Sequence, residues 1–236
     1  MTDKSASPPK HARLLSPRER LLRVLRGQEP DRVPVWMLYP RECYGAYVDV
    51  YSLPAYRDVA PYIHAHTDWL DRRGIASPFL YTAAAQVEST TVEERGAQVT
   101  RTVVHTPYGP LWEEARVEPA SSAHWQTRYL LESLEDLEKL LAIPYEPAVP
   151  EVSAFLAAAA RLGDDGLMMM DLGAPVGFLD SHAAPETLAC WIATDLGTLV
   201  RFLDVLLARQ MRFVEEALRR GVGPVFFITG SEFVAP

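Results

Sequence analysis

Two continuous apolar runs most strongly constrain how this chain can fold. Residues 167–172 (Leu-Met-Met-Met-Asp-Leu) and 225–229 (Val-Phe-Phe-Ile-Thr) lack the polar alternation of a strand with one face in water. Such runs are typical of parallel strands that are covered on both faces, so the three consecutive methionines are expected in the core. Residues 33–39 (Val-Pro-Val-Trp-Met-Leu-Tyr) have the same character, and Pro34 suits the first residues of a strand. We predict main strands at 33–39, 75–81, 167–172 and 225–229.

The segments between these strands predict helices. Ser16-Pro17-Arg18-Glu19 forms a capping box with proline at the first helical position, and Gly27 suits the end of that helix. Further helices are expected at 52–66, 133–141, 150–162, 185–192 and 195–220, the last with an apolar stripe at helical spacing. Apolar strands that alternate with helices indicate an α/β fold with a parallel sheet and right-handed crossovers.

Residues 86–131 follow a different pattern. Two strand-like runs, 87–94 and 99–105, flank Arg95-Gly96-Ala97, which is a hairpin signal. A turn at 106–110 leads to two further runs at 111–117 and 125–131. We predict an antiparallel hairpin insertion over 86–131.

Composition narrows the class of protein. The 236 residues are 48% apolar and 23% charged, which supports a packed core, and the net charge of −8 argues against a nucleic-acid surface. No segment reaches the roughly 18 uninterrupted apolar residues of a membrane span, and residues 1–15 are polar without a signal-peptide pattern. Two cysteines do not make a disulfide framework. We expect a cytoplasmic protein with a disordered tail at 1–15 and no nucleic-acid or membrane partner.

Four motifs carry a family resemblance. Residues 22–36 read Leu-Arg-Val-Leu-Arg-Gly-Gln-Glu-Pro-Asp-Arg-Val-Pro-Val-Trp. Residues 106–110 (Thr-Pro-Tyr-Gly-Pro), 131–137 (Leu-Glu-Ser-Leu-Glu-Asp-Leu) and 173–175 (Gly-Ala-Pro) follow in order. The chain resembles the uroporphyrinogen decarboxylase superfamily over residues 16–236. In that superfamily a leading helix ends in a G-x-E-P-D-R-V-P-V turn before the first strand.

The resemblance implies a TIM (β/α)8 barrel, of which this chain would supply about the first four strands. A complete barrel needs about 250 residues without insertions, so the sequence looks truncated before the barrel closes. We therefore expect an incomplete barrel over 16–236. Its open sheet edges would favour self-association or a homodimer.

The superfamily includes two chemistries that act on small molecules. One is decarboxylation of uroporphyrinogen, a carboxylated tetrapyrrole, without a cofactor. The other is zinc-dependent methyl transfer from a corrinoid partner to a thiol, for which the resemblance places the zinc ligands beyond this chain. The third alternative is an inactive barrel fragment that acts as a binding or assembly module.

Candidate site residues follow from the position of barrel chemistry at the C-terminal ends of strands. The family's arginine-bearing loop corresponds to residues 39–43, in which Arg41 is our candidate catalytic anion holder and Tyr39 a candidate substrate contact. Asp171, at the end of a buried run, is the second catalytic candidate, because an unpaired charge there would be costly. We expect Gly173 of the Gly-Ala-Pro turn to contact substrate.

Polar residues near the other strand ends complete the prediction. Ser231 and Glu232 follow the last strand and are candidate substrate contacts. Asp180 and His182 lie near the loop after residues 167–172, where a lone histidine is more often structural than catalytic. We assign no metal ligand within the chain.

Overall fold

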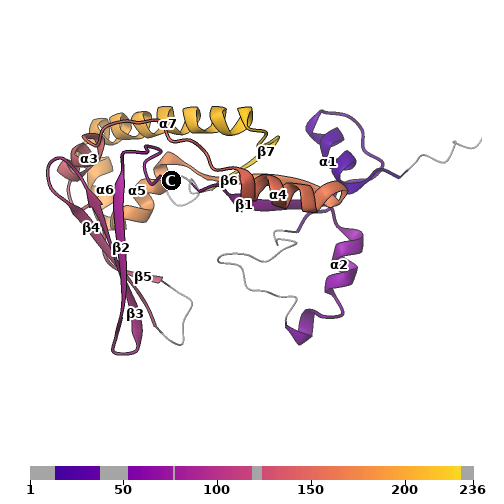
Figure 1. The fold of residues 1–236 in the computed structure, drawn as a ribbon, viewed down its shortest axis with the longest axis horizontal. Helices are drawn as coiled ribbons and strands as arrows, with labels where there is room; N and C mark the ends of the chain where they lie inside the picture. Colours follow the sequence, from indigo (N-terminus) through magenta and orange to yellow (C-terminus); the bar gives the residue numbers. More distant parts are fainter. Residues whose placement is uncertain (1–13, 38–52, 77, 119–123, 230–236) are drawn as a thin grey trace, which may run out of the picture. The chain divides into compact units, whose positions relative to one another are not determined.

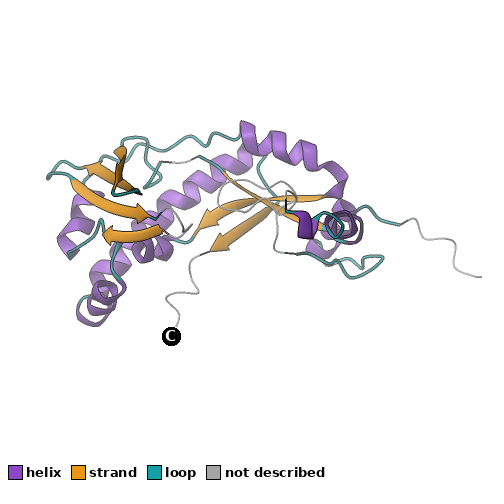
Figure 2. Cartoon of the chain, turned by 90° about the horizontal axis from the view of Figure 1, so that it is seen from below, coloured by secondary structure: helices purple, strands orange, loops and turns teal. Residues whose placement is uncertain are grey.

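The computed structural model of the chain describes residues 14–37, 53–76, 78–118 and 124–229. It contains a parallel sheet of three strands in the order β1-β6-β7 and an antiparallel sheet of four in the order β2-β3-β4-β5 (Figures 1 and 2). The predicted mixed α/β class and the antiparallel excursion are therefore confirmed. The described residues form no closed barrel, and the incomplete TIM barrel stays a prediction.

Along the chain, the antiparallel sheet is formed by consecutive strands that lie between the first and the second strand of the parallel sheet. The strands are β1 (Trp69–Gly74), β2 (Gln86–Glu94), β3 (Ala97–His105), β4 (Leu111–Val117), β5 (His124–Arg128), β6 (Gly166–Gly173) and β7 (Val225–Thr229). The α-helices are α1 (Pro17–Leu25), α2 (Ala60–His66), α3 (Leu134–Leu141), α4 (Ser153–Leu162), α5 (Pro175–His182), α6 (Pro185–Thr194) and α7 (Leu196–Arg219). No helix among the described residues is long and apolar enough to cross a membrane.

The chain forms two compact units. The first comprises Met1–Gly74, Ser153–Met170 and Gly223–Phe226, and the second comprises Ile75–Val152, Asp171–Val222 and Phe227–Pro236. Strands β6 and β7 begin in the first unit and end in the second.

Close approach of β1 and β6 defines the core of the first unit. A Cβ atom on Gly166 would lie 2.0 Å from the carbonyl oxygen of Trp69, so only glycine fits at the start of β6. The methionines at 168–170 are buried as predicted, and α4 turns Phe155, Ala158 and Leu162 into the interior at helical spacing.

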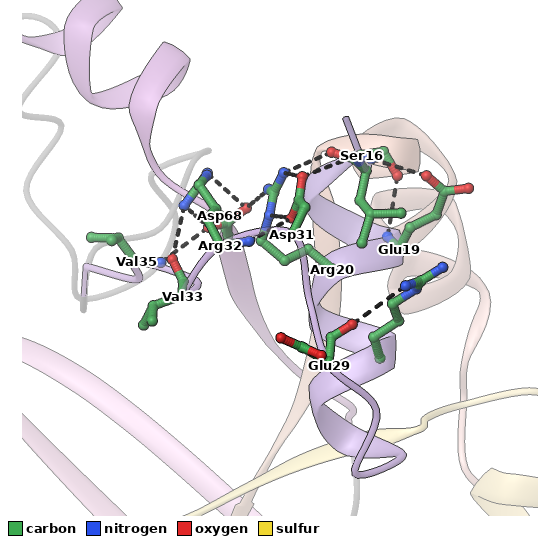
Figure 3. A network of polar contacts seen from close by, with 11 residues as sticks. Ser16, Glu19, Arg20, Glu29, Asp31, Arg32, Val33, Val35 and Asp68 are labelled. Carbon is green, nitrogen blue, oxygen red and sulfur yellow. Dashed lines mark hydrogen bonds and ion pairs between the residues drawn. The ribbon is translucent and has the colours of Figure 1, made fainter. Parts of the chain in front are cut away.

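A buried polar network joins α1 to β1 (Figure 3). The Arg20 guanidinium donates to Asp31 from Nε at 2.6 Å and also pairs with Asp68, whose side chain is fully buried. Asp68 pairs with Arg32 at 2.8 Å and accepts the Val35 N–H at 3.0 Å. Two arginines pair with two aspartates, so the charges of the network compensate one another. Asp31 and Arg32 of the Glu-Pro-Asp-Arg motif thereby connect α1 to Asp68, the residue that precedes β1.

Two predicted strands of the first sheet are wrong. Residues 33–37 form no strand. Asp68 contacts their backbone instead at Val35, where the Asp68 N–H donates to the Val35 carbonyl at 2.7 Å and the Asp68 carboxylate accepts the Val35 N–H at 3.0 Å. The predicted strand at 75–81 is a bridge and a turn in its described residues, and the observed strand is β1, at Trp69–Gly74. β1 was not predicted because it has no apolar run; its Asp71 is nevertheless only 2% exposed.

The antiparallel sheet of the second unit is a meander. β2 and β3 pair from Gln86↔His105 to Glu94↔Ala97, and the Arg95-Gly96 turn between them has positive φ at both residues. This is the turn geometry that matches the twist of a two-residue hairpin. On β4, the Trp112 ring makes cation–π contacts with the guanidinium groups of Arg101 and Arg128, 4.4 and 4.1 Å from the ring centre.

Helices of the second unit pack around a single apolar cluster. α7 contacts α3, α5 and α6, and the cluster includes Leu137, Leu179, Trp191 and Phe202. The predicted helices at 133–141, 185–192 and 195–220 are confirmed, the last capped by the Asp195 side chain. α5 was not predicted, because Gly-Ala-Pro was interpreted as the start of a loop.

Candidate active site

A cavity of about 390 Å³ lies at the C-terminal end of β6, within the second unit. It is lined by Phe79, Tyr81, Gly173, Ala174, Pro175, Gly177, Phe178, Asp180, Ser181, His182 and Leu206. Its volume falls in the range of small-molecule sites, and its wall combines aromatic rings with a few polar groups, as such sites do.

Local sequence explains how α5 presents the polar groups. β6 ends at Gly173, and Pro175 occupies the first helical turn, where its missing N–H costs nothing. The helix then runs only to His182, so Asp180, Ser181 and His182 all fall in its last turn beside the cavity.

His182 is held by a carboxylate from the antiparallel sheet. Its Nδ1 lies 2.8 Å from Oε2 of Glu113 on β4, and the two side chains are only 15% and 16% exposed. Gln126 of β5 also approaches Glu113 Oε2, at 3.4 Å. The imidazole packs against the rings of Phe79 and Phe178, with centroid distances of 4.7 and 4.5 Å. The ring is therefore fixed in both position and orientation.

Tyr81 stands on a strained backbone at the cavity wall. Its φ of 55° is rare for a bulky residue, and its N–H closes a turn by donating to the Pro78 carbonyl at 2.9 Å. The Gln210 amide lies 3.4 Å from the Tyr81 hydroxyl and also donates to the Gly173 carbonyl. Burial raises the pKa of the Tyr81 phenol, so the hydroxyl keeps its proton at neutral pH. Strain of this kind is concentrated at functional sites.

The arrangement suits proton transfer. Because Nδ1 of His182 is engaged by Glu113, Nε2 is the ring nitrogen left for exchange with a substrate. Tyr81 adds a neutral hydroxyl donor, and Asp180 and Ser181 add polar contacts. Among the described residues no group of three or more His, Cys, Asp or Glu side chains could hold a metal ion.

The predicted site residues fall into three groups: those that line the cavity, one that does not, and those outside the described residues. Gly173 lines the cavity, whereas Asp171, two residues earlier on β6, is not part of the wall. The candidates Tyr39, Arg41, Ser231 and Glu232 lie outside the described residues, as does the predicted tail except for its last two residues. Asp180 and His182, treated as weak candidates, both line the cavity.

Sequence reasoning missed Tyr81 and Glu113. Nothing in the sequence marks Tyr81, because its positive φ is imposed by the turn in which it lies. Glu113 is separated from His182 by 69 residues, and only the pairing of the meander brings it to α5. The Thr-Pro-Tyr-Gly-Pro turn just before β4 was the nearest usable signal.

The fold and the site together define a mixed α/β protein with a histidine–carboxylate pair beside a strand-end cavity. No protein-family model matches the chain, and neither the curated proteins nor the solved structures include a match to it.

Proposed function

We propose that this protein is a lyase of the uroporphyrinogen decarboxylase type, acting without a cofactor on a carboxylated tetrapyrrole or a similar polyanion. The observation that carries the proposal is the His182–Glu113 pair at the wall of the cavity that begins where β6 ends. The sequence resemblance supplies the reaction class, and Arg41 remains our candidate for holding the substrate's carboxylates.

The proposed reaction replaces a carboxylate with a proton. The bond between the substrate carbon and its carboxylate breaks, CO2 leaves, and the electron pair remains on the carbon. His182, protonated at both ring nitrogens, delivers the Nε2 proton to that carbon and recovers a proton from solvent. Glu113 fixes which nitrogen faces the reaction by holding Nδ1, and Tyr81 donates a hydrogen bond to a substrate oxygen.

The test is turnover of uroporphyrinogen, kept reduced, with the carboxyl count of the products followed by chromatography. We expect His182→Gln to lower kcat by about 10²–10⁴-fold, the usual contribution of a general acid. His105→Gln is the matched control, because His105 also contacts a carboxylate, Glu88 at 3.0 Å, but both side chains are largely exposed. The control should retain the wild-type rate.

Glu113 is a positioning residue and needs a separate readout. Glu113→Leu should lower kcat and also remove the preference for the proton on Nδ1, which ¹⁵N NMR of the His182 ring reports directly. Equal activity of the wild type and His182→Gln would refute the proposal. Tight binding of uroporphyrinogen without any turnover would favour the binding-module alternative.

A further inference from the structure

A second cavity of the second unit is lined by charged side chains that have no role in the proposed reaction. It has a volume of about 380 Å³ and lies between the C-terminal half of α7 and the segment after α3. Its lining residues are Tyr81, Tyr145, Pro147, Ala148, Val149, Arg209, Arg212, Phe213, Glu215, Glu216 and Arg219.

Arg209 is the unusual member of this set. The residue is 7% exposed, and its Nη1 is buried without a hydrogen-bond partner among the described residues. Its guanidinium lies 4.8 Å from the centre of the Tyr145 ring, which holds the planar group in place. Burial lowers the pKa of Arg209, with no described carboxylate to offset that cost. A buried cation without an anion is unfavourable unless something else supplies the negative charge.

The other charges of the cavity divide into paired and unpaired groups. Arg219 pairs with Glu216 at 2.9 Å and with Glu215 at 3.8 Å, and Arg220 pairs with Glu216 at 2.8 Å, so these four side chains compensate one another. Arg212, in contrast, makes no ion pair within the described ranges, and its guanidinium lies 5.8 Å from the same Tyr145 ring as Arg209. Arg209 and Arg212, both beside the Tyr145 ring, thus face a cavity whose glutamates already form ion pairs with other arginines.

We propose that this cavity binds the carboxylate of a small organic acid, with Arg209 as its principal partner. A guanidinium presents a planar fork of donors that matches a carboxylate, and the unused Nη1 of Arg209 is such a donor. Because the two glutamates of the wall pair with Arg219 and Arg220, the positive charge that faces the cavity comes from Arg209 and Arg212. Part of the wall is apolar, which favours a carboxylate on an apolar body over inorganic phosphate. The apolar surface of Pro147, Val149 and Phe213 accommodates the body of the acid.

The site is distinct from the proposed reaction and does not depend on it. The test is therefore a binding measurement and not an activity: isothermal titration of the full chain with benzoate, and in parallel with inorganic phosphate. We expect benzoate to bind and phosphate to bind at least tenfold more weakly. Arg209→Met should weaken benzoate binding by tenfold or more. Arg201→Met is the matched control, because Arg201 lies on the same helix, is exposed and pairs with Glu138 away from the cavity.

Thermal denaturation without benzoate shows whether Arg209 has a structural role instead. Because methionine removes a buried unpaired charge and fills similar space, Arg209→Met should melt at the wild-type temperature or above it. Arg209→Lys keeps the charge but loses the fork, and should bind benzoate with intermediate affinity. A large fall in melting temperature for Arg209→Met would overturn the proposal, since it would mean that the guanidinium already has a partner. Unchanged benzoate binding by that variant, absence of binding to the wild type, or tighter binding of phosphate would also overturn it.

Discussion

Replacing Gly166 with alanine tests the pairing of β1 with β6. Gly166 has an extended backbone, with φ 176°, so alanine adopts its conformation without strain. The substitution therefore acts only through a steric clash. The new Cβ would lie 2.0 Å from the Trp69 carbonyl oxygen and 2.7 Å from the Trp69 Cβ. Real Cβ atoms essentially never come within 3.0 Å of such neighbours, so the strands must separate by about 1 Å.

The magnitude follows from the hydrogen bonds between the strands. A separation of about 1 Å stretches a backbone N–H···O distance from about 2.9 Å to about 3.9 Å, which is no longer a hydrogen bond. Each bond lost from a buried ladder costs about 1 kcal/mol, or more where a polar group stays unsatisfied. If about two or three such bonds are lost, Gly166→Ala should lower the free energy of unfolding by about 2–4 kcal/mol.

Urea unfolding followed by far-UV circular dichroism measures this change. Gly74→Ala is the control, because Gly74 ends the neighbouring strand with no atom within 4 Å of its Cβ position and no positive φ. The control should be neutral or stabilised by about 0.4–1 kcal/mol, as for other glycines with compatible backbones. If Gly166→Ala were as stable as Gly74→Ala, β6 would not begin against Trp69 and the described parallel pairing would be incorrect.

Three further predictions concern stability. Asp68→Asn removes the buried partner of Arg20 and Arg32 and should cost about 3–5 kcal/mol in urea unfolding, whereas the exposed Asp204→Asn should be neutral. The Arg20 hydrogen bond holds the pKa of Asp31 well below its ordinary value of about 3.9, so the Asp31 carboxylate stabilises the fold above pH 4. The stability difference between wild type and Asp31→Asn should therefore shrink as the pH falls below 4, and a difference that grew with acid would contradict the network. Arg95→Asn should raise the melting temperature, with a gain of about 0.5–1 kcal/mol, because asparagine tolerates the positive φ of 54° better than arginine does.

Local signals predicted most of the second unit. The strands β2, β3 and β4 and the helices α3, α6 and α7 were expected within a few residues of their observed bounds. These elements are specified by turns, caps and apolar periodicity, which act between near neighbours in sequence. β6 and β7 were also predicted from their continuous apolar runs. β6 is buried as expected, whereas β7 is only half-buried and its Ile228 is 63% exposed, so the expectation that both faces of β7 are covered was wrong.

The first sheet strand could not be predicted from local pattern. β1 carries Asp71 in a buried position and directly follows Asp68, so it reads as a polar turn. Asp68 is tolerated in the interior because Arg20 and Arg32 reach it from 48 and 36 residues away. At residues 33–37 the local pattern misled in the opposite direction. Their apolar pattern predicted a strand, but their backbone makes only isolated hydrogen bonds with Asp68.

The only residues of the candidate site that the sequence indicated are those just after the C-terminal end of a predicted strand. Gly173 was named on that basis and lines the cavity, whereas Asp180 and His182 were only placed near that strand end, with His182 interpreted as more often structural. Glu113 and Tyr81 were missed because their roles arise from tertiary geometry, one from the meander and one from a turn with unusual backbone angles.

Tyr81 forms part of the wall of both cavities. The two compartments are thus separated in part by a single phenol ring, supported by Phe213 at 5.4 Å between ring centroids. A ligand that displaced the Tyr81 ring from one cavity would therefore change the wall of the other. If a ligand in one cavity changes the affinity of the other cavity for its ligand by some factor, the second ligand must change the affinity for the first by the same factor.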